Sequence, residues 1–172
     1  SSWENSYQSD PSKLPKLHIS PHQKRERVSV AGKTQSDLLI GNAGPSRSHP
    51  LYLAASIGDS ILGQFGMMGR LGKTVREDAG LAYYISSNLS GSLGPGPWTI
   101  SAGVHPKQEV NVINLILEEL TKFTAELVTE QELSDNKANY IGRMPLSLES
   151  NAGVAGSILH LEKNDLGLDY YQ

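Results

Sequence analysis

FGMMGRLGKTVREDAGLAYY, residues 65–84, is the stretch from which the fold and function of the chain are best argued. Gly72, Lys73 and Thr74 match the second half of the G-x-x-x-x-G-K-[ST] loop, whose backbone N–H groups wrap a phosphate. The first glycine of that motif falls at position 67, which is Met67. A phosphate loop also follows a buried strand, whereas the residues before this stretch have a helical pattern. Nucleotide binding is therefore only a third hypothesis, which a titration with ATP would test.

The same stretch predicts a helix, a sharp turn and a strand. We expect the helix over residues 68–78, ended by Gly80, because glycine allows the reversal, and the strand over residues 81–91. Arg76 then lies in the last helical turn and Tyr83 on the strand. A guanidinium and a phenol at one edge can donate hydrogen bonds to peptide carbonyls or to an oxyanion. Spacing alone favours a plainer interpretation, in which Arg76 pairs with a nearby acid and Tyr83 is a half-buried strand residue.

The residues before this stretch predict a linker followed by a strand and a helix. Residues 1–26 are rich in Ser and Pro and lack periodicity, which indicates a linker or lead-in segment. We expect a single domain over residues 27–172, apparently truncated at its C-terminal end. Its first strand should run from Arg27 to Gly41, and its first helix should begin at Pro50. The expected buried face of that helix consists of Leu51, Ala54, Ala55, Gly58, Ile61 and Leu62.

A hairpin and a long helix are expected next. Residues 98–104, WTISAGV, are the predicted antiparallel partner of the strand over residues 81–91. His105 is expected to cap the following helix or to lie on the surface. That helix begins at Pro106 and carries an apolar stripe with steps of three and four residues. The stripe consists of Val110, Ile113, Leu117, Leu120, Thr124 and Leu127, and it is widened by Ile116 and Phe123.

Two more helices complete the predicted architecture. Thr129 and Glu132 have the spacing of a capping box, so a helix should begin near Glu130 and end or kink at Pro145. The last helix is expected over residues 150–164. Strands followed by a hairpin and helices predict an α+β fold with two layers, in which a largely antiparallel sheet has its helices packed on one face.

Composition excludes several classes of protein. The 172 residues are 38% hydrophobic and carry a net charge of -3, and no apolar run reaches the ~20 residues that span a bilayer. Residues 11–33 hold six basic side chains and one acidic side chain, but they lack the aromatics of a nucleic-acid site, so we expect a solvated linker. The absence of cysteine favours a reducing compartment, and we expect a cytoplasmic protein without nucleic-acid or membrane partners. Because Ser replaces Met at position 1, we also expect a piece of a longer protein.

Searches for a metal site and for a nucleophile both fail in this sequence. His18 and His22 lie close together, but a proline between them denies them a shared helical face. Neither H-E-x-x-H nor H-x-x-E-H is present, and His160 has its nearest acid on the opposite side of a helix. No G-x-S-x-G motif occurs either. We therefore expect no metal ligand, no bound cofactor and no independent catalytic centre in this chain.

A family resemblance changes the interpretation of the opening stretch. GRLGKTVREDAGLAYYISS resembles the G-R-L-x-x-x-[IV]-R-E-x-x-G-L-A-Y signature of insulinase-type metallopeptidases, which include pitrilysin and the mitochondrial processing peptidase. The segments KTQSDLLIGNAGPSRSHPLYLAASIGDSILG and VTEQELSDNKANYIGRMPLSLESNAGVAGSIL are similar to the family as well. The resemblance covers residues 27–172, and it is most specific between Arg76 and Tyr83.

The resemblance implies a division of labour between two halves of a peptidase. In this family one half holds zinc through H-x-x-E-H, and the opposite half offers an Arg and a Tyr to the substrate. Arg76 and Tyr83 match that second pair, so the resemblance implies a substrate-binding domain that completes the active site of a zinc endopeptidase. Zinc would come from the other half of the protein or from a partner subunit, and a peptide would be the substrate. The alternative is an inactive scaffold or assembly subunit, like the core proteins of the respiratory bc1 complex.

Overall fold

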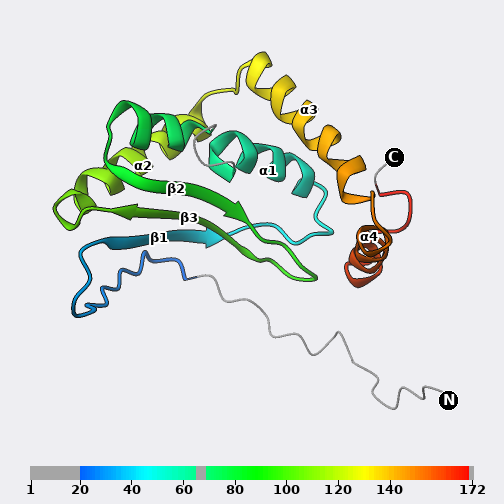
Figure 1. Cartoon of the computed structure of the whole chain (residues 1–172), viewed down its shortest axis with the longest axis horizontal. Helices are drawn as coiled ribbons and strands as arrows, with labels where there is room; N and C mark the ends of the chain where they lie inside the picture. The colour runs from blue at the N-terminus through cyan, green and yellow to red at the C-terminus, as the bar shows by residue number, and fades with distance from the viewer. Residues whose placement is uncertain (1–19, 65–68, 171–172) are drawn as a thin grey trace, which may run out of the picture.

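The protein has an α+β fold, as the sequence predicts. The computed structural model describes residues 20–64 and 69–170 (Figure 1). The helices and strands, in chain order, are β1 (Ser36–Ala43), α1 (Tyr52–Asp59), η2 (Ser60–Gln64), η4 (Gly72–Asp78), β2 (Ala82–Leu89), β3 (Pro97–Val104), η5 (Pro106–Gln108), α2 (Glu109–Ala125), α3 (Glu130–Ser147) and α4 (Asn151–Lys163).

The three strands form one antiparallel sheet in the order β1-β3-β2. The central strand β3 pairs Ser101 with Leu39 of β1, and it pairs Ala102 with Ile85 of β2. Because side chains alternate across a strand, Ile85 and Ala102 face the helices and are buried, whereas Leu39 lies on the opposite face and is 73% exposed. The sheet therefore has one covered face and one open face.

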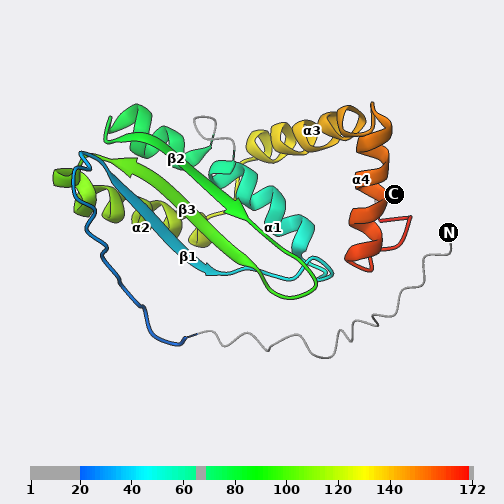
Figure 2. The ribbon, with the colours of Figure 1, turned by 60° about the horizontal axis from the view of Figure 1, so that its bottom comes forward.

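The helices supply the second layer and pack on the covered face of the sheet. Helices α1 and α2 lie behind the strands in Figure 2, and α3 and α4 continue the helical side beyond the sheet. The core between the layers consists of Leu62, Leu71, Val75, Ile85, Ile100, Ala102, Val104, Val112 and Ile116. Two of these residues belong to the helical stretch of η4: Leu71 directly precedes Gly72, where η4 begins, and Val75 lies within η4. The core therefore holds the inner side of the helical stretch that carries Arg76.

Several helix boundaries and caps agree with the sequence. Thr129 and Glu132 form the predicted capping box, in which the Thr129 hydroxyl accepts a hydrogen bond from the Glu132 N–H and the Glu132 carboxylate accepts one from the Thr129 N–H. Ser150 caps α4 through a hydrogen bond from the Gly153 N–H at 3.1 Å. His105 accepts a hydrogen bond from the Lys107 N–H at 3.2 Å, which confirms its expected place as a cap.

The first strand is shorter than the sequence predicts. It begins at Ser36, and the side chains of Val28 and Val30 are 83% and 58% exposed outside the sheet. A turn around Gly32, which has a φ of +78°, separates these valines from β1. The alternation of Val28 and Val30 resembles that of a strand, but hydrophobic pattern alone does not show whether a neighbouring strand is available for pairing.

The predicted face of the first helix is only partly correct. Ile61 and Leu62 are buried as predicted, but Leu51 is 63% exposed, and Tyr52 and Asp59 are buried in α1 instead. Asp59 is 1% exposed because its carboxylate accepts hydrogen bonds from the Trp98 indole at 2.7 Å and from the Leu89 N–H at 3.0 Å. A buried acid with both oxygens bonded cannot be recognised from hydrophobic periodicity, because its partners are distant in the sequence.

Two predictions about the later helices need correction. The predicted stripe of α2 is only partly correct. Ile116 is buried, and Leu120 and Phe123 pack against the core, as predicted. Val110 and Leu117 are instead 64% and 43% exposed, and Val112 and Glu119 take buried positions outside the predicted stripe. Pro145 does not end its helix: it lies inside the last turn of α3, which continues to Ser147.

Candidate functional site

Arg76 lies in the last turn of η4, as predicted, and its side chain is exposed. Helix η4 has π-helical hydrogen bonding, a rare arrangement that occurs mostly as short segments and often at functional sites. The neighbouring Val75 is fully buried and fixes the inner side of the helix. Among the described residues, Arg76 has no hydrogen bond and no ion pair, so the predicted surface ion pair is not observed. Its guanidinium is therefore available to a ligand.

A tight turn connects η4 to the strand that carries Tyr83. Gly80 has a φ of +65°, a left-handed conformation that costs an L-residue about 1 kcal/mol and glycine almost nothing. The Leu81 N–H donates a hydrogen bond of 3.0 Å to the Val75 carbonyl, which closes the turn. Arg76 directly follows Val75, and Tyr83 lies two residues after Leu81. The hydrogen bond therefore brings together the backbone segments that carry the two predicted site residues.

A β-bulge directs the side chain of Tyr83. Val104 pairs with Ala82, but the next residue of β3, Gly103, pairs with Tyr84, so Tyr83 is the extra residue of β2. Without the bulge, Tyr83 would share the covered face with Ile85. The extra residue leaves Ala82 packed against the core and Tyr83 58% exposed. Bulges often re-aim side chains next to active sites. The expectation of a half-buried strand tyrosine is thus not met.

The next tyrosine, Tyr84, differs from Tyr83 because it has a partner in the sheet. Its hydroxyl donates a hydrogen bond of 2.9 Å to Asp37 on β1. This bond raises the pKa of Tyr84, and bonds from Gln35 and then from Tyr84 lower the pKa of Asp37. No hydrogen bond of the Tyr83 hydroxyl to another described residue is present. Tyr83 therefore offers a free phenolic donor, whereas the phenol of Tyr84 is engaged.

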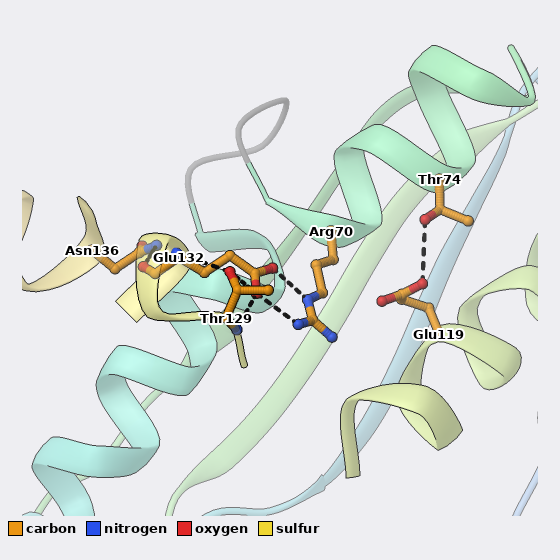
Figure 3. A network of polar contacts seen from close by, with 6 residues as sticks. All are labelled: Arg70, Thr74, Glu119, Thr129, Glu132 and Asn136. Carbon is orange, nitrogen blue, oxygen red and sulfur yellow. Dashed lines mark hydrogen bonds and ion pairs between the residues drawn. The ribbon is translucent and has the colours of Figure 1, made fainter. Parts of the chain in front are cut away.

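An ion pair holds the start of the Arg76-bearing helical stretch against α3. Arg70 donates two hydrogen bonds to Glu132, from Nε at 2.7 Å and from Nη2 at 2.8 Å (Figure 3). Thr129 donates two more to the same carboxylate, from its N–H and its hydroxyl. The hydrogen bonds from Arg70, more than those from Thr129, lower the pKa of Glu132 from 4.5 to about 2, and the pair raises the pKa of Arg70.

Further polar contacts join η2 and η4 to the helices around them. The Thr74 hydroxyl of η4 donates a hydrogen bond of 3.3 Å to the buried Glu119 of α2 (Figure 3). Ser60 of η2 donates to the side-chain oxygen of Asn136 on α3, and the Asn136 amide donates to the Glu132 carbonyl. The sequence did not indicate these contacts. Glu132 was predicted as a capping residue, but nothing in the sequence pointed to Arg70 as its partner.

The comparisons with known proteins identify the family. A family model described as the peptidase M16 inactive domain matches residues 1–140. The chain belongs to this family. The match confirms the resemblance to insulinase-type peptidases. This M16 domain is similar to a crystal structure of a peptidase M16 inactive domain from Pseudomonas fluorescens, with a TM-score of 0.74 and 28% sequence identity. The match covers 80% of this chain and 32% of the Pseudomonas chain.

Relatives of this M16 domain are named as zinc proteases. An uncharacterized zinc protease of Streptomyces coelicolor is 28% identical over 157 residues, which are 87% of this chain and 33% of that protein. An uncharacterized zinc protease of Bacillus subtilis is 33% identical over 116 residues, which are 67% of this chain and 28% of that protein. The chain therefore spans about one third of the length of the curated relatives that it matches.

The described residues of this M16 domain do not fit a zinc ion. Zinc needs three or more converging ligands, and no group of three His, Cys, Asp or Glu side chains among residues 20–64 and 69–170 could hold one. His18 of the H-x-x-x-H spacing lies outside the described residues. None of the helices that the structure describes is long and apolar enough to cross a membrane. Arg76 and Tyr83 therefore remain the candidates for chemistry in this domain.

Proposed function

We propose that this M16 domain binds a peptide and completes the active site of a zinc endopeptidase whose metal is held elsewhere. The observation that carries the proposal is the exposure of Arg76 and Tyr83 on either side of the Gly80 turn, with neither donor engaged by a described residue. The relatives named as zinc proteases support the reaction class. The metal would belong to another half of the same protein or to a partner subunit.

The two side chains suit a peptide bond that is being attacked. As the scissile carbonyl becomes tetrahedral, negative charge develops on its oxygen, and fixed donors stabilise that charge more than they stabilise the bound substrate. Arg76 supplies a permanent cation with several N–H groups, and Tyr83 supplies one O–H group. The ligand-free donors are exposed to water, so a closed arrangement of the two halves would strengthen their interaction with the substrate.

Kinetics of the intact enzyme test this assignment. Arg76→Ala and Tyr83→Phe should each lower kcat/KM for peptide hydrolysis by about 10²–10³, the usual loss when one oxyanion donor is removed. Zinc content, measured by atomic absorption on the same preparations, should not change, because neither residue belongs to a metal site. The variants should be made in the full-length protein together with its zinc-bearing half.

Two matched controls are available within the same segment. Lys73→Ala removes an exposed cation of η4 that pairs with Asp78, and Tyr84→Phe removes the hydroxyl bonded to Asp37. Both control variants should retain wild-type kinetics. Wild-type kinetics for Arg76→Ala and Tyr83→Phe as well would refute the role in catalysis and favour the alternative, a catalytically inactive scaffold or assembly subunit.

A further inference from the structure

The helical stretch that bears Arg76 is bonded to two other helices. Arg70, at the start of this stretch, forms its two-bonded ion pair with Glu132 of α3 at 2.7 and 2.8 Å. Four residues later, Thr74 donates its hydrogen bond to Glu119 of α2. In Figure 3 both side chains extend from the same side of the stretch, Arg70 toward Glu132 near its start and Thr74 toward Glu119 further along. The orientation of the helix is thus fixed by polar contacts in addition to its buried side chains.

We propose that Arg70 and Glu132 are positioning residues, which hold the helix so that Arg76 points toward the substrate. This role rests on the proposed function of Arg76. Arg76 has no partner among the described residues, so the position of its side chain is set by the backbone of the helix that carries it. A displacement of catalytic groups by about 1 Å is enough to cost up to about 100-fold in rate. A firm anchor six residues earlier in the same stretch therefore has a direct consequence for the chemistry.

The Arg70–Glu132 pair is better suited to this role than the other ion pairs of the described residues. Its side chains are 18% and 29% exposed, whereas those of Lys73 and Asp78 are 67% and 60% exposed. The Arg70 guanidinium also lies over the Phe123 ring of α2, 5.6 Å from its centroid. The planar fork of arginine and the ring contact each restrict its direction. An exposed pair on flexible stems provides no comparable restraint.

Glu132→Gln separates positioning from folding. Glutamine retains the shape of the side chain and still serves in a capping box, so α3 keeps its N-terminal cap while the charge that binds Arg70 is lost. In the intact enzyme we expect kcat to fall by about 10- to 100-fold with little change in KM, as when an interaction made only in the transition state is weakened. Arg70→Lys, which keeps the charge but loses the fork, should give a smaller fall in kcat.

The double variant Arg76→Ala/Glu132→Gln distinguishes a positioning role from general destabilisation. If Glu132 acts through Arg76, the double variant should be no slower than Arg76→Ala alone. A structural defect would lower kcat by the same factor in both backgrounds. Glu109→Gln is the matched control, because Glu109 accepts two hydrogen bonds from Arg27, at 3.0 and 2.9 Å, and, among the described residues, none from η4 or α3. The control should retain the wild-type kcat.

The outcomes separate the two proposals. If Arg76→Ala slows hydrolysis but Glu132→Gln and Arg70→Lys both retain the wild-type kcat, the positioning role is wrong and the proposed function stands. Multiplicative losses in the double variant also overturn the positioning role. If Arg76→Ala has no effect, the proposed function fails and the positioning role fails with it. A Glu132→Gln protein that does not fold, combined with wild-type kinetics for Arg70→Lys, likewise contradicts the positioning role.

Discussion

The Glu132 carboxylate illustrates how a single side chain serves two structural purposes. It caps α3 by accepting a hydrogen bond from the Thr129 N–H. It also binds the guanidinium of Arg70, the residue at the start of the neighbouring helical stretch. Both sets of donors favour the charged form, and they lower the pKa to about 2 from 4.5, against a smaller opposing effect of burial. A group of this kind links the stability of the fold to pH.

The stability conferred by Glu132 should be lost in acid. The unfolded carboxyl takes up a proton near pH 4.5 and the folded one only near pH 2, so the unfolded state binds more protons between these values and stability falls as the pH falls. Urea unfolding of this chain and of Glu132→Gln, followed from pH 7 to pH 2, measures the effect. The wild-type advantage should be constant above about pH 5 and should shrink toward pH 2. Stability curves of the two proteins that stay parallel down to pH 2 would contradict this assignment.

The connection from η4 to β2 depends on the backbone freedom of one glycine. At Gly80, where φ is +65°, an added Cβ would have no heavy atom within 4 Å, so a substitution there tests conformation without steric clash. Gly80→Ala should destabilise the chain by about 1 kcal/mol, because an L-residue is strained in the left-handed region. Urea unfolding measures this loss.

Gly142 provides the opposite case. It lies inside α3, it is exposed, and an added Cβ has no neighbour within 4 Å. Gly142→Ala should stabilise the chain by about 0.5–1 kcal/mol, because alanine is the better helix former. An equal response of both positions to alanine would show that backbone conformation is not the controlling factor at Gly80.

Helices and strands were easier to predict than the side chains that they bury. The capping box at Thr129 and the antiparallel pairing of β2 with β3 follow from local chemistry, and both are present. The predicted buried faces of the first helix and of α2 were only partly correct, because Asp59 and Glu119 occupy buried positions through hydrogen bonds to distant residues. Local patterns contain no information about such partners.

The same limit applies to the candidate site. The sequence placed Arg76 in the last turn of a helix and Tyr83 on the following strand, and both positions agree with the structure. The outward direction of Tyr83 depends on a bulge whose second strand, β3, lies further along the chain. The Arg70–Glu132 anchor joins residues 62 positions apart. Both features follow from packing, which local sequence does not reveal.

The molecule as a whole has two layers, and its sheet has one covered and one open face. Substitutions in the sheet should therefore differ in cost according to their face. Ile100→Ala, on the covered face of β3, should cost about 2–5 kcal/mol, whereas Leu39→Ala on the open face should cost less than about 1 kcal/mol. Urea unfolding of this chain compares the two variants directly. Similar costs for both would contradict the arrangement of layers.

The bulge in β2 matters for comparing this domain across genomes. Because one unpaired residue turns Tyr83 outward, the interval of seven positions between Arg76 and Tyr83 belongs to the arrangement as much as the two side chains do. A relative that has lost or gained one residue in this interval can keep both amino acids and still direct its phenol toward the helices. A comparison of sequences that requires the same spacing of seven positions between the Arg and the Tyr will exclude such relatives and keep those in which both side chains can reach a substrate.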